Sequence, residues 1–172
     1  QQLIRIAEKQ DCAVAAVQAT HEHLVGLYGT LRAKRVADQD GLYQIERIEE
    51  KPSLTRAELE LQTPGLRVGH YLCFFGMHVL PPTIFDLLGA ASAEQGRDNE
   101  LQLTPSLQRL SENERYLAME LAGTRYDIGI KFGVLRAQVA LWLAGNDHDQ
   151  MLTTLLELLA EARSHRALGL GG

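Results

Sequence analysis

The best candidate for a central strand reads Tyr71-Leu72-Cys73-Phe74-Phe75-Gly76-Met77-His78-Val79. This run is almost wholly apolar, and Pro81-Pro82 ends it because proline cannot donate to a strand ladder. Pro82 can occupy the first turn of a helix, which we expect to run to about Leu88. An apolar strand followed at once by a helix is typical of layered folds.

The sequence before this run predicts more strands. Residues 13–17 form a short apolar run that we interpret as a buried strand. Residues 30–37 and 42–50 are rich in strand-forming residues, and Asp40-Gly41 between them is a strong hairpin signal. Strands mixed with helices, with a hairpin among them, indicate an α/β or α+β layer fold.

Two amphipathic helices are predicted at the end of the chain. Apolar residues repeat at helical spacing over 132–143, until Gly145-Asn146, and again over 152–159. The second repeat is an apolar stripe made of Leu152, Leu155, Leu156 and Leu159. Such a stripe has to be buried, either on the preceding helix or on another subunit. We therefore expect a homo-oligomer.

Composition excludes several classes of protein. The chain has 172 residues, which suits one domain with a sizeable core, and its formal charge of -5 argues against a nucleic-acid binder. Cys12 and Cys73 lie far apart, so neither a disulfide framework nor a thiolate zinc site is indicated, and a cytoplasmic location fits best. The apolar runs fall short of the ~20 residues that span a bilayer, so no membrane partner is expected.

Four short segments carry the functional signal. They are Ile48-Glu49-Glu50-Lys51-Pro52, residues 76–85, residues 99–104 and residues 126–134. Taken singly, each has an ordinary explanation: a solvated strand end, a turn glycine, or Asp127 as the cap of a helix that starts near Lys131. Their common order along the chain is much harder to obtain by chance.

Together the segments resemble the C-terminal half of bacterial UTP-glucose-1-phosphate uridylyltransferases and related sugar nucleotidyltransferases. That family reads V-E-K-P, G-R-Y-x-L-x-P-x-I-F, G-E-x-Q-L-T-D and Y-D-x-G-x-K-x-G-Y. The resemblance covers about residues 1–145, leaving 146–172 as a C-terminal helix and tail that we expect to serve oligomerisation. It implies an α/β fold that is part of a Rossmann-like nucleotidyltransferase fold, with a mixed sheet, a hairpin insertion and two C-terminal helices.

The resemblance also implies a sugar site. Glu50 and Lys51 correspond to the residues that contact the hexose hydroxyls and the sugar phosphate, and Gly76 to a glycine that allows close backbone approach to the sugar. The chemistry is apt, because a carboxylate accepts from hydroxyls and an ammonium group neutralises phosphate. Adjacent strand residues normally point to opposite faces, so we expect Pro52 to end the strand and to hold Lys51 in extended geometry.

The last motif implies catalytic groups and a cofactor. Asp127 corresponds to the family's Mg²⁺ ligand, and Lys131 to the lysine that faces phosphate near a helix N-terminus. The implied substrates are glucose 1-phosphate and UTP, and the implied products are UDP-glucose and pyrophosphate. Glu100 matches the glutamate of the third motif and is expected to be structural.

Several features keep other functions open. Pro105 replaces an aspartate of the family pattern, and Met77-His78 replaces Arg-Tyr, which puts the sugar in question. The family's Gly-rich nucleotide loop is absent, and residues 1–8 already have a helical pattern without an initiator Met, so we expect an inactive fragment of a longer enzyme. The alternatives are a thymidylyl-, cytidylyl- or adenylyltransferase, or a non-catalytic sugar-phosphate-binding relative. His21-Glu22-His23 lacks a third metal ligand at suitable spacing and is interpreted as a solvated loop.

Overall fold

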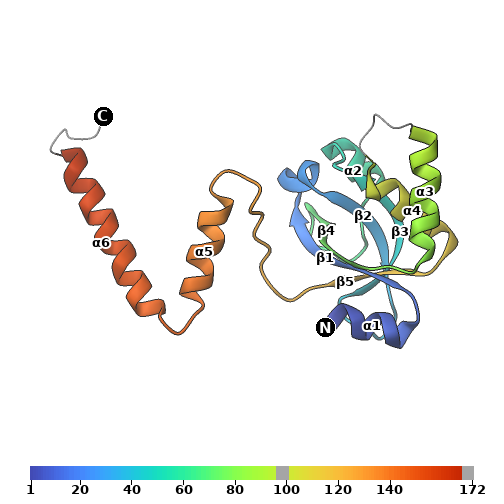
Figure 1. Cartoon of the computed structure of the whole chain (residues 1–172), viewed down its shortest axis with the longest axis horizontal. Coiled ribbons are helices and arrows are strands. Elements are labelled where there is room, and N and C mark those ends of the chain that lie inside the picture. Colours follow the sequence, from blue (N-terminus) through green and yellow to red (C-terminus); the bar gives the residue numbers. More distant parts are fainter. Residues whose placement is uncertain (96–100, 168–172) are drawn as a thin grey trace. The chain divides into compact units, whose positions relative to one another are not determined.

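The computed structural model describes residues 1–95 and 101–167 and divides into two compact units, residues 1–122 and 123–172 (Figure 1). Glu100 and the tail beyond residue 167 lie outside the described residues. The predicted boundary lies at residue 145 because the family resemblance ends there. The compact units of the structure instead divide after Ala122.

The first unit contains all the strands of the described residues. Its elements in chain order are α1 (Gln2–Gln10), β1 (Ala13–His21), the 3₁₀ helix η1 (Glu22–Leu27), β2 (Gly29–Arg35), β3 (Leu42–Glu50), α2 (Leu54–Glu60), β4 (His70–Val79), α3 (Thr83–Gln95), α4 (Leu103–Asn113) and β5 (Tyr116–Glu120). The predicted strands over 13–17 and 71–79 and the helix after Pro82 are therefore confirmed.

The sheet is mixed and closes on itself in the order β1-β4-β2-β3-β5. β1 pairs parallel with β5, and the remaining pairs are antiparallel. β2 and β3 form the predicted hairpin, whose connection holds Asp38 and Gly41 at positive φ, 57° and 69°. Of the predicted Asp40-Gly41 signal, Gly41 adopts the left-handed conformation, which glycine tolerates better than other residues.

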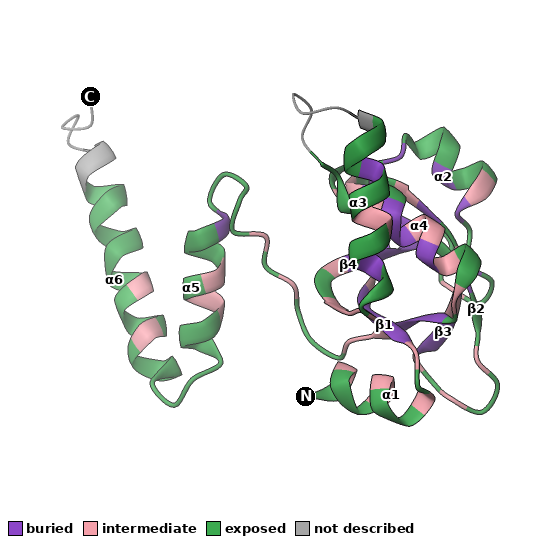
Figure 2. Ribbon diagram, turned by 45° about the vertical axis from the view of Figure 1, so that its right-hand side comes forward, coloured by how far each residue is buried: buried purple, intermediate pink, exposed green. Residues whose placement is uncertain are grey.

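Both faces of β1 are buried against helices. Alternate residues such as Ala15 and Val17 enter the main core, where Leu107 and Leu110 of α4 also lie. Val14, on the other face, packs in a cluster with apolar residues of α1. Figure 2 shows the buried residues concentrated on the strands and on the inner sides of α3 and α4. The same core includes Ile48, near the end of β3, and Phe74, just before Gly76 in β4.

β4 carries a bulge where it runs beside β1. Ala15 pairs with His78 and Val17 with Phe74, so β4 has extra residues between these two pairs. Gly76 lies among them with φ of 83°, a value that glycine adopts without strain. Bulges of this kind are common next to functional sites because they redirect the chain at a sheet edge.

The second unit consists of α5 (Gly133–Leu143) and α6 (His148–Ala167), which confirms the two predicted closing helices. Most of the apolar stripe on α6 is exposed within the described part of the second unit: Leu155 is partly buried, but Leu152, Leu156 and Leu159 are 51%, 60% and 61% exposed. Leu141 and Trp142 of α5 are also exposed. Within the described residues, no helix combines the length and apolar character needed to cross a bilayer.

Candidate functional site

The end of β3 brings two predicted sugar-site residues to a sharp bend. Glu50 is the last residue of the strand, and Lys51 follows with φ of 46° while its N–H donates to the carbonyl oxygen of Tyr28 at 3.2 Å. The prediction that Pro52 holds Lys51 extended is wrong, because the chain leaves the strand through a left-handed residue. Such a conformation costs a non-glycine residue about 1–3 kcal/mol, and strained residues of this kind cluster at functional sites. The bend interrupts the strict alternation of strand faces, which the prediction of one ligand shared by Glu50 and Lys51 requires.

The Glu50 carboxylate is held between β2 and α4. Its Oε2 accepts a hydrogen bond of 2.6 Å from Oγ1 of Thr104, in the first turn of α4. Gly29 is the strand partner of Glu50, and a Cβ added there would lie 3.0 Å from Glu50 Oε2 and 2.9 Å from Cδ2 of Phe74. The absence of a side chain at Gly29 therefore leaves the space that the carboxylate occupies.

Gly76 lies exposed in the β4 bulge, two residues after Phe74. A Cβ at Gly76 would meet no atom within 4 Å, so glycine is required there by its positive φ and not by crowding within the chain. The space above its backbone is consistent with the close approach of a sugar. The structure thus shows an accessible backbone at the predicted position.

His78, next to the bulge, forms a polar contact that the sequence did not reveal. Its Nδ1 lies 2.7 Å from the hydroxyl oxygen of Tyr116 across the sheet, and its ring meets the edge of Phe74 at 5.0 Å between centroids. Burial lowers the pKa of His78 and raises the pKa of Tyr116 far above its ordinary value. Both groups are therefore neutral near pH 7, and they form a hydrogen-bonded pair that joins the half-buried His78 to Tyr116 in the core.

The lowered pKa of His78 predicts a loss of stability in mild acid. The unfolded chain takes up the proton near the ordinary value of 6.5 and the folded chain only at lower pH, so acid favours unfolding across that interval. Urea denaturation at pH 8 and pH 5.5 should show a smaller pH-dependent loss for His78→Asn than for the wild type. Replacement of the exposed His148 by Asn is the control. An identical pH dependence in His78→Asn and the wild type would contradict the prediction.

Asp127 and Lys131 lie in the second unit, on the segment that leads into α5. Asp127 Oδ1 accepts from the backbone N–H of Gly129 at 2.9 Å, which forms a local turn. The alternative role of capping the helix is wrong, because α5 begins at Gly133 with Phe132 at its N-cap position. Lys131 is exposed just before α5, as predicted, with its Nζ 5.0 Å from the Phe132 ring centroid.

Gly133 keeps this segment compact. A Cβ at Gly133 would clash with the carbonyl oxygen of Asp127, so the chain folds back on itself where only glycine fits. The last glycine of the fourth motif therefore has a steric role. It allows the turn that carries Asp127 to pack against the start of α5.

Asp127 can serve as a Mg²⁺ ligand only with help from other groups. Among residues 1–95 and 101–167, no cluster of three or more His, Cys, Asp or Glu side chains could hold a metal. A single half-exposed carboxylate still fits Mg²⁺, which commonly takes one or two carboxylates and completes its shell with phosphate oxygens and water. Asp127 alone could therefore hold Mg²⁺ only where phosphate oxygens and water complete its coordination shell.

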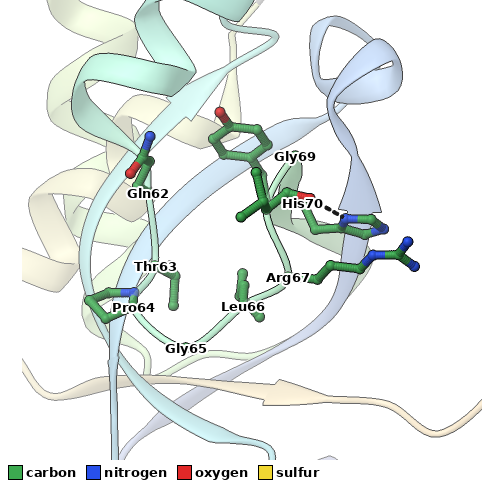
Figure 3. Close-up of a pocket in the computed structure, with 10 residues that line it drawn as sticks. Gln62, Thr63, Pro64, Gly65, Leu66, Arg67, Gly69 and His70 are labelled. Carbon is green, nitrogen blue, oxygen red and sulfur yellow. Dashed lines mark hydrogen bonds between the residues drawn. The ribbon is translucent and has the colours of Figure 1, made fainter.

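Two other polar regions contain none of the predicted site residues. Strand pairing places His70 beside His21, with ring centroids 5.3 Å apart, and His21 Nδ1 lies 2.8 Å from His23 Nδ1. Sequence spacing could not show this third imidazole. The loop before β4, together with the first two residues of that strand, lines a hollow of about 230 Å³, with Thr63 and Leu66 on its inner side (Figure 3). Thr63 ties this loop to β2 by accepting from the backbone N–H of Ala33.

No profile of a known protein family matches the chain. The UTP–glucose-1-phosphate uridylyltransferase of Streptococcus pneumoniae serotype 4 is 31% identical over 138 residues, which cover 80% of this chain and 42% of that protein. A second uridylyltransferase, from Streptococcus pyogenes serotype M1, is 32% identical over the same shares of both chains. The chain thus spans about two fifths of the length of these curated relatives.

Solved structures agree with these relatives. The crystal structure of a UDP-glucose pyrophosphorylase complexed with UDP-glucose superposes with a TM-score of 0.66 and 26% identity, over 84% of this chain and 49% of that one. A UTP-bound enzyme of the same type from Acinetobacter baumannii gives a TM-score of 0.69 at 24% identity, over 91% of this chain and 49% of that one, and supports the fold alone. The predicted fold class and the resemblance carried by the four motifs are confirmed.

Proposed function

We propose that this chain is the sugar-binding part of a UTP–glucose-1-phosphate uridylyltransferase. The observation that carries the proposal is the 31% identity to a curated uridylyltransferase over 80% of the chain. The bend at the end of β3 supports it, because there the acidic Glu50 is followed directly by the basic Lys51 in a left-handed conformation.

In the proposed reaction, a phosphate oxygen of glucose 1-phosphate attacks the α-phosphorus of UTP in line, and pyrophosphate leaves. Glu50 would orient the hexose by accepting from its hydroxyls, and Lys51 and Lys131 would neutralise phosphate charge. Asp127 would hold Mg²⁺, which supplies charge neutralisation at the phosphates when bound. The chain's own contribution is positioning and electrostatics, as in phosphoryl transfer generally.

The remaining parts of the proposal concern the whole protein. Because the chain covers less than half of its relatives, we infer that residues outside it bind most of the UTP. A cytoplasmic location is supported by Cys12 and Cys73, which form no disulfide in the described part of the chain. A homo-oligomer is supported by the uncovered leucines of α6.

A competing function is supported by the departures at Met77-His78 and Pro105. These positions lie in the second and third motifs, where the family pattern has Arg-Tyr and Asp. The competitor is a nucleotidyltransferase for another sugar, or a relative that binds sugar phosphate without catalysis. A different base also stays open, because residues outside this chain would read it.

The first test measures pyrophosphate release with Mg²⁺ and glucose 1-phosphate. The full-length protein should turn over with UTP and much more slowly with dTTP, CTP or ATP, whereas the 172-residue chain should show no turnover. Clear turnover by this chain alone would contradict the assignment of the nucleotide site to other residues. A full-length protein that binds glucose 1-phosphate but releases no pyrophosphate with any nucleotide would favour the non-catalytic relative.

A further inference from the structure

Helix α4 is firmly attached to strand β3. The side-chain Oε1 of Gln108 accepts a 2.6 Å hydrogen bond from the backbone N–H of Ile48, near the end of the strand. Leu107 and Leu110 of the same helix are fully or almost fully buried in the main core. Because residues four apart lie on one side of a helix, Thr104 faces the strand in the same way as Gln108, one turn earlier. The position of the Thr104 hydroxyl is therefore fixed by the packing of the whole helix.

That hydroxyl meets the carboxylate of Glu50. The 2.6 Å separation from Oγ1 to Oε2 is typical of a hydroxyl that donates to an ionised carboxylate, which is among the stronger hydrogen bonds in proteins. Glu50 is exposed, and an exposed glutamate normally samples several rotamers. Here Thr104 holds one carboxylate oxygen over the gap left by Gly29.

We propose that Thr104 is a positioning residue for the sugar, acting through Glu50. The inference rests on the proposed function, in which Glu50 accepts from hexose hydroxyls. By holding Oε2, Thr104 fixes the direction of Oε1, so the acceptor is ordered before the sugar arrives and less freedom is lost on binding. The pairing also explains why the third motif accompanies the first. The first motif supplies the Glu50 carboxylate, and the third supplies Thr104, which orients that carboxylate.

The test is a kinetic comparison in the full-length protein. Thr104→Val removes the hydroxyl and keeps the shape. It should raise KM for glucose 1-phosphate about tenfold, the effect expected from one hydrogen bond to a charged group. KM for UTP and kcat should stay close to wild type, because the lost contact concerns only sugar binding. Thr104→Ser restores the donor and should return KM to within about twofold of wild type.

The chain offers a matched control in Thr83. This threonine begins α3, and its Oγ1 donates to Glu114 Oε1 at 2.7 Å, so it repeats the same contact outside the proposed site. Thr83→Val should leave KM for both substrates unchanged. In a Glu50→Ala background, which removes the acceptor of the Thr104 hydroxyl, Thr104→Val should add less than about twofold, because residues that act through one contact are not additive.

The outcomes separate the two proposals. A full-length protein that neither binds nor converts glucose 1-phosphate overturns the proposed function, and this inference with it. An active wild type with an unaffected Thr104→Val variant overturns this inference alone. So does a variant whose KM rises equally for UTP and sugar, or one that Thr104→Ser fails to rescue, since either result would indicate a general structural role.

Discussion

Replacing Asp127 by Asn in the full-length protein is expected to lower turnover at least about a hundredfold, because several kcal/mol of metal-assisted charge stabilisation are lost. The asparagine side-chain oxygen can still accept from the backbone N–H of Gly129, so the local turn should survive. The substitution therefore removes the negative charge of residue 127 and keeps the geometry of the turn. Pyrophosphate release at saturating substrate and Mg²⁺ measures the effect.

The controls for Asp127→Asn separate metal binding from folding. Asp147→Asn removes an exposed carboxylate between α5 and α6 and should leave turnover unchanged. Asp127→Ala loses both the charge and the turn, and should lower turnover at least as far as Asp127→Asn. If Asp127→Asn retains wild-type turnover with an unchanged melting temperature, Asp127 acts only through its turn and the proposed Mg²⁺ role is wrong.

The elements of the first unit followed from local signals. Asp40-Gly41 predicted the β2–β3 hairpin because Asp-Gly is a common sequence in tight hairpin turns. The apolar run over 71–79 predicted β4 because a strand buried in a sheet consists mainly of apolar residues. These signals act between residues close together in the chain. The candidate site residues were found through motifs, which are also short continuous segments and can be identified without the structure.

The contacts around the site could not be predicted in the same way. Thr104 meets Glu50, and His78 meets Tyr116, only after strands and helices far apart in sequence have packed in one register. The left-handed Lys51 was missed because the expectation for a residue before proline is extended backbone. Tertiary packing overrode that local preference.

The second large effect is expected in assembly. We expect the full-length protein to form a dimer or larger species at micromolar concentration, because Leu152, Leu156, Leu158 and Leu159 of α6 are all more than half exposed. Leu155→Glu with Leu159→Glu should convert it to monomer, since charged groups are very costly to bury in an apolar contact. Light scattering measures the mass, and the 172-residue chain should likewise exceed its monomer mass of 19.1 kDa.

The matched control adds the same charges to another side of α6. Thr153→Glu with Thr154→Glu alters exposed residues outside the leucine stripe and should leave the assembly intact. A wild-type monomer would contradict the prediction outright. An assembly that persists in the leucine double variant would place the contact on another surface, such as the exposed Leu141 and Trp142 of α5.

The closure of the sheet also affects how the first unit folds. The β1–β5 pair joins residues 13–17 to residues 116–120, almost the full length of the unit. Contacts between such distant segments require a large loop to close, which slows folding far more than it changes stability. During synthesis, β1 leaves the ribosome long before its parallel partner exists. Until β5 emerges, β1 presents an unpaired edge within the first unit, and this edge is open to misassociation.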